Sequence, residues 1–179
     1  MADTVNVQAL RRELFSVPET LVYALLDGAS ADGLLDKLWE ARPEQGCLYR
    51  GELEPDMAEV APYLVLLRPE VELTQWVLEK GWGNHWGIFI ATYDDLGNLR
   101  RHFRRFTMVR APDGKELYFR FYDPRVLRVF LPTCTPGELA GFFGPVLFYA
   151  MEDEDPGKML RFWLKDDHLR REELRVTEA

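Results

Sequence analysis

The sequence is short of the residues that most enzymes use as nucleophiles, bases and metal ligands. Its 179 residues include two serines and three scattered histidines, with neither a GxSxG nor an HExxH motif. Cys47 and Cys134 are isolated, which predicts reduced thiols rather than a disulfide or a zinc site. These absences argue against a hydrolase and a zinc enzyme. We therefore expect no catalytic residues, no metal and no cofactor.

Long hydrophobic runs are also missing. No apolar run approaches the roughly 18 residues that a membrane span needs. The first ten residues, MADTVNVQAL, lack the basic and apolar regions of a signal peptide. We therefore expect a cytoplasmic protein without a membrane partner. Its length favours one main lobe over residues 1–150, followed by a short extension over residues 151–179.

The apolar residues that are present predict an α/β fold. Strand-like runs begin at residues 20, 47, 62, 85, 116, 146 and 159. Apolar stripes at helical spacing lie at 34–39 and 73–77, and Thr135-Pro136-Gly137-Glu138 is a capping box that begins a short helix. Alternating strands and helices predict a mixed central sheet covered by helices.

The end of the chain predicts two further elements. The acidic turn EDEDPG separates the last two strand-like runs, which indicates a C-terminal antiparallel β-hairpin. The charged segment from Asp167 predicts a short helical tail, either frayed or the stub of a second lobe.

Positive charge is concentrated in one stretch of an acidic chain. Residues 99–128 hold eight arginines and one lysine against three acids, a net charge of +6, whereas the whole chain is −8 and the remainder therefore −14. At helical spacing, residues 95–106 place an apolar stripe opposite a fan of four arginines. Alternation over residues 116–122 turns Phe119 and Phe121 inward and Arg120 and Tyr122 outward.

Arginine and aromatic side chains of this kind commonly anchor protein interfaces. The alternative is a solvated face with ordinary salt bridges. In the loop GWGNHWG, which fits no phosphate-binding motif, two tryptophans either pack on the core or line a surface pocket. We predict that partner binding involves Arg100, Arg101, Arg104, Arg105, Arg120, Tyr122, Arg125, Trp82 and Trp86.

One enzymatic arrangement deserves comparison. Asp27 ends an apolar strand and Asp94 and Asp95 follow another, as magnesium ligands do in phosphate-handling α/β enzymes. Asp27-Gly28 is also a common turn, however, and Asp94 and Asp95 stand where a helix N-cap is expected. The turn-and-cap interpretation is favoured, because no third ligand or phosphate-cradling loop accompanies these residues.

Five segments between about residues 18 and 147 form a recognisable series: LVYALLDGA, LYRGELEPDMAEVAPYLVLL, GWGNHWGIFIAT, LRRHFRRFTMVR and FRFYDPRVLRVFLP. Together they resemble the type VI secretion effector adaptor, or chaperone, domain of the Tap or Tec family. Its signature positions here are Gly87, Arg104, Arg120, Tyr122, Asp123 and Arg125. Many relatives carry a helical lobe after this domain, whereas about thirty residues follow the match in this chain.

The resemblance implies a non-enzymatic cytoplasmic adaptor that binds an effector, expected at its N-terminal segment, and helps load it onto the VgrG spike tip. Two alternatives remain: a nucleic-acid or phosphate-binding module that uses the arginines, and a small metal-dependent phosphate-handling enzyme. The net charge of −8 and the lack of an RRM, KH or helix-turn-helix pattern argue against nucleic acid as the partner.

Overall fold

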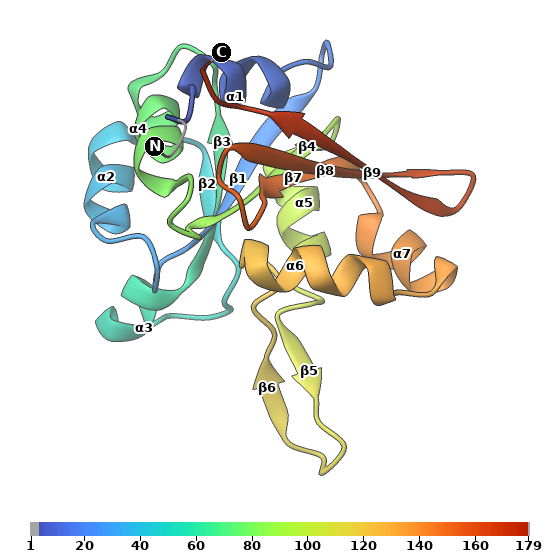
Figure 1. Ribbon diagram of the computed structural model, residues 1–179. Helices are drawn as coiled ribbons and strands as arrows, with labels where there is room; N and C mark the ends of the chain where they lie inside the picture. Colours follow the sequence, from blue (N-terminus) through green and yellow to red (C-terminus); the bar gives the residue numbers. More distant parts are fainter. Residues whose placement is uncertain (1–3, 179) are drawn as a thin grey trace.

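The computed structural model describes residues 4–178 and contains one large sheet and one separate ribbon (Figure 1). The large sheet has seven strands in the order β2-β3-β1-β4-β7-β8-β9. The ribbon pairs β5 with β6. The strands are β1 Leu21–Asp27, β2 Gln45–Cys47, β3 Pro62–Leu67, β4 Gly87–Thr92, β5 Met108–Arg110, β6 Glu116–Tyr118, β7 Val146–Glu152, β8 Lys158–Lys165 and β9 His168–Arg175.

Helices cover both faces of the large sheet, which confirms the α/β class with a helix-covered central sheet. One face packs against α1, α2 and α4, and the other against α5, α6 and α7. The helices are α1 Val7–Leu14, α2 Leu34–Ala41, α3 Pro55–Val60, α4 Glu72–Gly81, α5 Leu96–Phe103, α6 Pro124–Phe130 and α7 Pro136–Phe143, with a 3-10 turn at Leu131–Thr133. None of these helices of residues 4–178 has the length and apolar character of a membrane span.

Local signals placed most of these elements correctly. β1, β3, β4, β7 and β8 confirm the predicted strands, and β7 pairs with β8 in the expected antiparallel hairpin. Thr135 and Glu138 form both hydrogen bonds of the predicted capping box at α7. One detail differs from the mixed sheet, since each neighbouring pair of described strands is antiparallel. Strand spacing along a sequence does not fix pairing direction, which the connections decide in space.

The predicted helical tail is wrong. Residues 168–175 form β9, which pairs with β8 along its whole length. Arg161 of β8 pairs with Glu172 of β9, while Leu169 and Leu174 pack against opposite cores. Cross-strand pairing therefore outweighs the helix propensity of this segment. The extension from residue 151 adds β8 and β9 to the same sheet, and residue 150 lies within β7.

The predicted strand 116–122 is correct only in part. β6 ends at Tyr118, after which the chain turns into α6 at Pro124. Phe121 is fully buried and Phe119 half-buried as expected, but Tyr122, predicted to face outward, is buried as well. The helical stripe of α2 also has one exception. Trp39 is 75% exposed, and the Arg42 guanidinium lies over its ring, 5.6 Å from the ring centroid.

Candidate protein-binding surface

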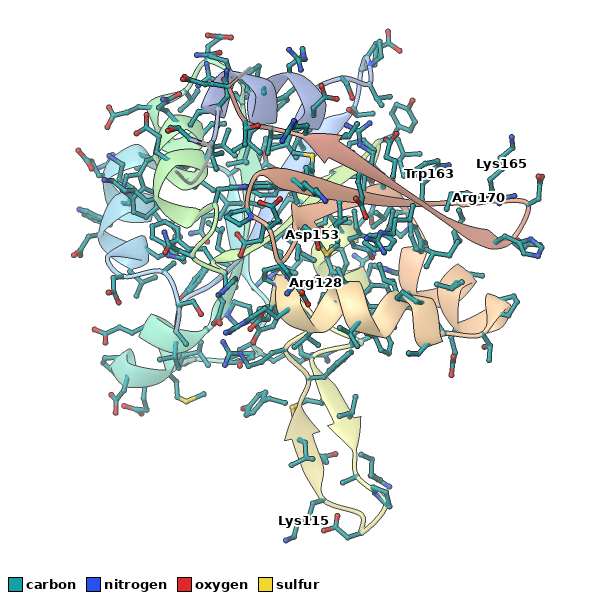
Figure 2. All side chains as sticks on the ribbon, viewed as in Figure 1. Lys115, Arg128, Asp153, Trp163, Lys165 and Arg170 are labelled. Atoms are coloured by element: carbon teal, nitrogen blue, oxygen red, sulfur yellow. The ribbon has the colours of Figure 1, made fainter. Side chains whose placement is uncertain are left out.

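The ribbon of β5 and β6 projects from the body of the protein (Figure 1). We call residues 108–118 the arm. All six of its strand residues are exposed, including the apolar side chains of Met108, Val109, Leu117 and Tyr118. Lys115 lies at its tip (Figure 2). This hairpin is absent from the elements predicted above, although the Pro-Asp-Gly sequence at 112–114, between MVR and ELY, is a strong turn signal.

The base of the arm is fixed by an ion pair between Arg120 and the buried carboxylate of Asp27. Asp27 is 1% exposed and also accepts hydrogen bonds from the Ala29 amide (3.1 Å) and the Ser30 hydroxyl (3.0 Å). The Arg120 side chain is about half exposed. Asp27 therefore forms the predicted turn, and the ion pair ties the end of β1 to the segment that follows β6.

Two arginines of α5 stabilise the opposite side of the base. Arg104 donates hydrogen bonds to the carbonyl oxygens of Cys47, Leu48 and Tyr49, at 3.1 to 3.2 Å. Arg100 donates to the Cys47 carbonyl oxygen at 2.8 Å. These carbonyl groups lie where β2 ends, so both half-buried arginines hold the β2–α3 loop against α5.

Five arginines, in the β2–α3 loop and in or directly after α5, lack an acidic counterpart within residues 4–178. No carboxylate there forms an ion pair with the guanidinium groups of Arg50, Arg100, Arg101, Arg104 or Arg105, which we call the basic surface. Burial and then the charges of Arg100 and Arg50 lower the pKa of Arg104. Unpaired like charges held together favour an anionic partner. Arg50 lies outside the arginine-rich window of the sequence and is therefore not among the predicted binding residues.

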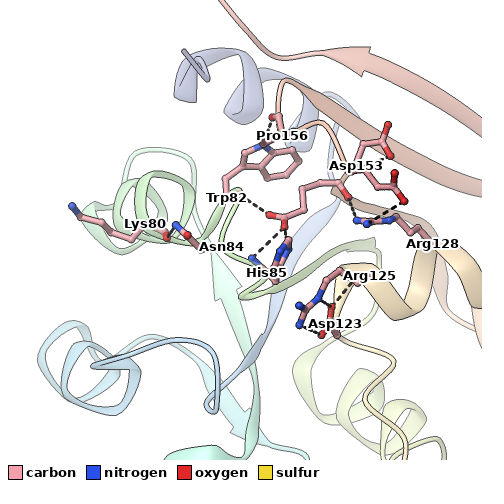
Figure 3. A network of polar contacts seen from close by, with 12 residues as sticks. Lys80, Trp82, Asn84, His85, Asp123, Arg125, Arg128, Asp153 and Pro156 are labelled. Carbon is pink, nitrogen blue, oxygen red and sulfur yellow. Dashed lines mark hydrogen bonds and ion pairs between the residues drawn. The ribbon is translucent and has the colours of Figure 1, made fainter. Parts of the chain in front are cut away.

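Arg125 does not belong to the basic surface, because Asp123 neutralises it locally (Figure 3). Its guanidinium donates two hydrogen bonds to Asp123, at 2.7 and 3.0 Å, and Asp123 also caps α6. Burial would raise the pKa of Asp123, but the hydrogen bonds and charge of Arg125 lower it. This pair stabilises the start of α6.

The tryptophans of the loop 81–87 pack against the core, one of the two outcomes anticipated. Trp82 and Trp86 are buried, and the Trp82 indole donates to the Pro156 carbonyl oxygen at 2.7 Å (Figure 3). The buried Glu152 carboxylate accepts hydrogen bonds from the amide of His85 and from that of Gly83. A Cβ atom at Gly87 would overlap the Leu25 carbonyl oxygen. These contacts join the loop to the β7–β8 turn.

The predicted site residues therefore differ in how far their side chains are exposed. Arg101 on α5 and Arg105 just after its end are exposed, and the side chains of Arg120 and Arg125 are about half exposed. Arg100 and Arg104 are half-buried. Tyr122, Trp82 and Trp86 are buried in the structure of the single chain. Of Asp94 and Asp95, both expected near a helix N-cap, Asp95 caps α5. Within residues 4–178, no three His, Cys, Asp or Glu side chains cluster as a metal site requires.

His102 makes the stability of this region pH dependent. Its Nε2 donates to the Phe142 carbonyl oxygen (2.8 Å), and its Nδ1 accepts from Arg105 (2.9 Å), so only the neutral ring satisfies both contacts. Burial lowers the pKa of His102, and the Arg105 charge lowers it further, although the Phe142 hydrogen bond opposes this shift.

We therefore expect His102 to destabilise the fold as the pH falls. In the unfolded chain His102 takes up a proton near its ordinary pKa of about 6.5, whereas in the folded chain it does so only at a lower pH. The stabilisation by the neutral ring is therefore complete above the unfolded pKa and is lost as the pH falls below it. Thermal denaturation between about pH 7.5 and 5 should show a steeper loss for the parent than for His102→Gln. Equal slopes would contradict this role.

Comparison with known proteins places the chain in a family. Residues 22–141 match the family model described as "Domain of unknown function (DUF4123)". The chain is 30% identical over 118 residues to the accessory protein VasW of Vibrio cholerae serotype O1, covering 64% of this chain and 39% of VasW. It thus spans about two fifths of the length of that relative. No solved structure matches the chain. The chain belongs to the DUF4123 family, the type VI secretion effector adaptor family that its motifs resemble.

Proposed function

We propose that this protein is a non-enzymatic, cytoplasmic adaptor that binds a type VI secretion effector and helps load it onto the VgrG spike. Membership of the family and the name of the relative, an accessory protein, support a role in that secretion system. The observation that carries the proposal is the basic surface, whose five guanidinium groups form no ion pair with a carboxylate of residues 4–178. An acidic segment of the effector, expected near its N-terminus, would neutralise them.

Co-expression tests the adaptor function directly. The tagged chain is produced together with the effector and the VgrG protein encoded beside it, and the purified material is analysed for both proteins and for nucleic acid by absorbance at 260 nm. A stable complex with the effector is expected. Nucleic acid as the only bound component would favour the alternative use of the same arginines on phosphates.

We expect charge reversal on the basic surface to weaken effector binding without unfolding the chain. Arg101 and Arg50 are exposed and serve best, since Arg105 contacts His102 and the Phe106 ring. The double variant Arg50→Glu/Arg101→Glu should bind at least roughly tenfold more weakly, with the larger loss at low salt. Titration at two salt concentrations, with circular dichroism of each variant, measures this.

A matched control is available on the β8–β9 hairpin. Lys165 and Arg170 are exposed near its turn, on a different side of the molecule from the arm (Figure 2). The variant Lys165→Glu/Arg170→Glu changes the net charge by the same amount. Equal weakening by both double variants would indicate a general charge effect and would remove the basic surface from the proposal.

A further inference from the structure

The arm consists of two strands of three residues, and neither outer edge is paired with a third strand of residues 4–178. A ribbon of two strands is marginally stable in water by itself. Here the base holds it, through Phe119 and Phe121 in the core and the Arg120 ion pair. The arm is thus a fixed, exposed ribbon with open edges.

The register shows which backbone groups the edges offer. The Phe119 amide donates to the Thr107 carbonyl oxygen, and the Ala111 amide donates to the Lys115 carbonyl oxygen. In these two residue pairs the backbone groups therefore point inward, toward the opposite strand of the ribbon. In an antiparallel ladder such pairs alternate with pairs whose amide and carbonyl groups point outward. The partners Met108↔Tyr118 and Arg110↔Glu116 lie between the inward pairs. Glu116 and Tyr118 therefore present their backbone groups at the outer edge of β6, and Met108 and Arg110 at that of β5.

The two edges have different surroundings. The Tyr118 ring of β6 lies 5.0 Å from that of Tyr49, whose carbonyl oxygen accepts a hydrogen bond from Arg104. Arg50 follows Tyr49 directly. The β6 edge therefore runs toward the basic surface, and in Figure 1 β6 lies on the α3 side of the arm while β5 lies on the other.

We propose that an extended, acidic segment of the effector adds to the outer edge of β6 as a third strand and continues onto the basic surface. This inference rests on the adaptor function proposed above. Backbone hydrogen bonds to Glu116 and Tyr118 supply affinity that is independent of side chains, as in other complexes formed by strand addition. The guanidinium groups of the basic surface then select acidic side chains.

The open edges of the large sheet are less suited to this partner. At β2, the Cys47 carbonyl oxygen is already occupied by Arg100 and Arg104. At β9, Glu172 and Glu173 are paired with Arg161 and Arg171.

Amide hydrogen exchange of the complex, followed by NMR, tests strand addition. In the complex with the effector, the amides of Glu116 and Tyr118 should exchange at least roughly tenfold more slowly than in the free chain, while those of Met108 and Arg110 should not change. If the complex forms and the β6 amides are unprotected, strand addition is wrong and the adaptor function stands. If no complex forms, the adaptor function fails and this inference fails with it.

Proline substitution provides an independent test with matched controls. Glu116→Pro removes an outward amide but no ladder hydrogen bond, and Glu116→Ala removes the same side chain while keeping that amide. Glu116→Pro should bind the effector roughly tenfold more weakly than Glu116→Ala. Arg110→Pro and Arg110→Ala, which alter the β5 edge, should differ little from each other. Equal affinities for the two Glu116 variants, with the arm intact by NMR, would overturn the inference.

Discussion

Phe121→Ala is expected to lower the free energy of unfolding by about 3 to 5 kcal/mol, the largest single effect that we predict. Phe121 is fully buried, and its ring lies 5.7 Å from Phe103 and 5.5 Å from both Phe142 and Tyr122. Truncation removes contacts with α5 and α7 and leaves a cavity that these rings fill poorly. For a chain of this size the melting temperature should fall by about 2 to 4 °C for each kcal/mol lost.

Two neighbouring positions serve as controls for this prediction. Phe119 is half-buried, so Phe119→Ala should cost less than Phe121→Ala, and Leu117→Ala, at 50% exposure, should change stability by about 0.5 kcal/mol or less. Chemical denaturation followed by circular dichroism measures all three. If Phe121→Ala unfolds at the same denaturant concentration as Leu117→Ala, the described packing at the base of the arm is wrong.

Arg120→Met should destabilise the fold by about 2 to 3 kcal/mol because it leaves the Asp27 carboxylate buried without its cation. This loss of stability is moderate, since the Arg120 side chain is about half exposed and Asp27 keeps its hydrogen bonds from Ala29 and Ser30. Asp27→Asn should cost less, because water can solvate the guanidinium that remains. The two substitutions differ in cost because Asp27 is buried whereas Arg120 is about half exposed.

The double variant Asp27→Asn/Arg120→Met separates the ion pair from other roles of these residues. Without a buried charge, it should be more stable than Arg120→Met, with a coupling energy of about 1 to 2 kcal/mol in a double-mutant cycle. Arg12→Met is the control, since Arg12 forms an exposed pair with Glu13 and should change stability little. Simple additivity of the two single variants would argue against the ion pair as a structural tie.

These contacts suggest different roles for the signature residues and for the arm. Arg104 and Arg120 hold the β2–α3 loop and the base of the arm, while Asp123 and Arg125 stabilise the start of α6. Four of the expected signature positions therefore stabilise elements from which the arm projects. The exposed arm and the exposed arginines of the basic surface, Arg50, Arg101 and Arg105, remain available for recognition.

Several features of this protein were determined by the sequence alone. Continuous apolar runs define β1, β3 and β4 because both faces of a central strand are buried. The side chains of Thr135 and Glu138 satisfy free backbone amides at the start of α7 within four residues. The concentration of arginines in residues 99–128 also identifies the positively charged region. It does not indicate which of these arginines form ion pairs or hydrogen bonds within the fold.

Only the tertiary structure decided the rest, because contacts distant in sequence compete with local preference. Pairing with β8 makes a strand of the helix-prone tail. The sharp turn after β6 buries Tyr122, which alternation in one continuous strand would have exposed. Arg100 and Arg104 look like surface residues on a helical wheel, yet they bind carbonyl groups more than 50 residues earlier in the chain. Burial and pairing depend on which segments meet, and a periodic pattern does not contain that information.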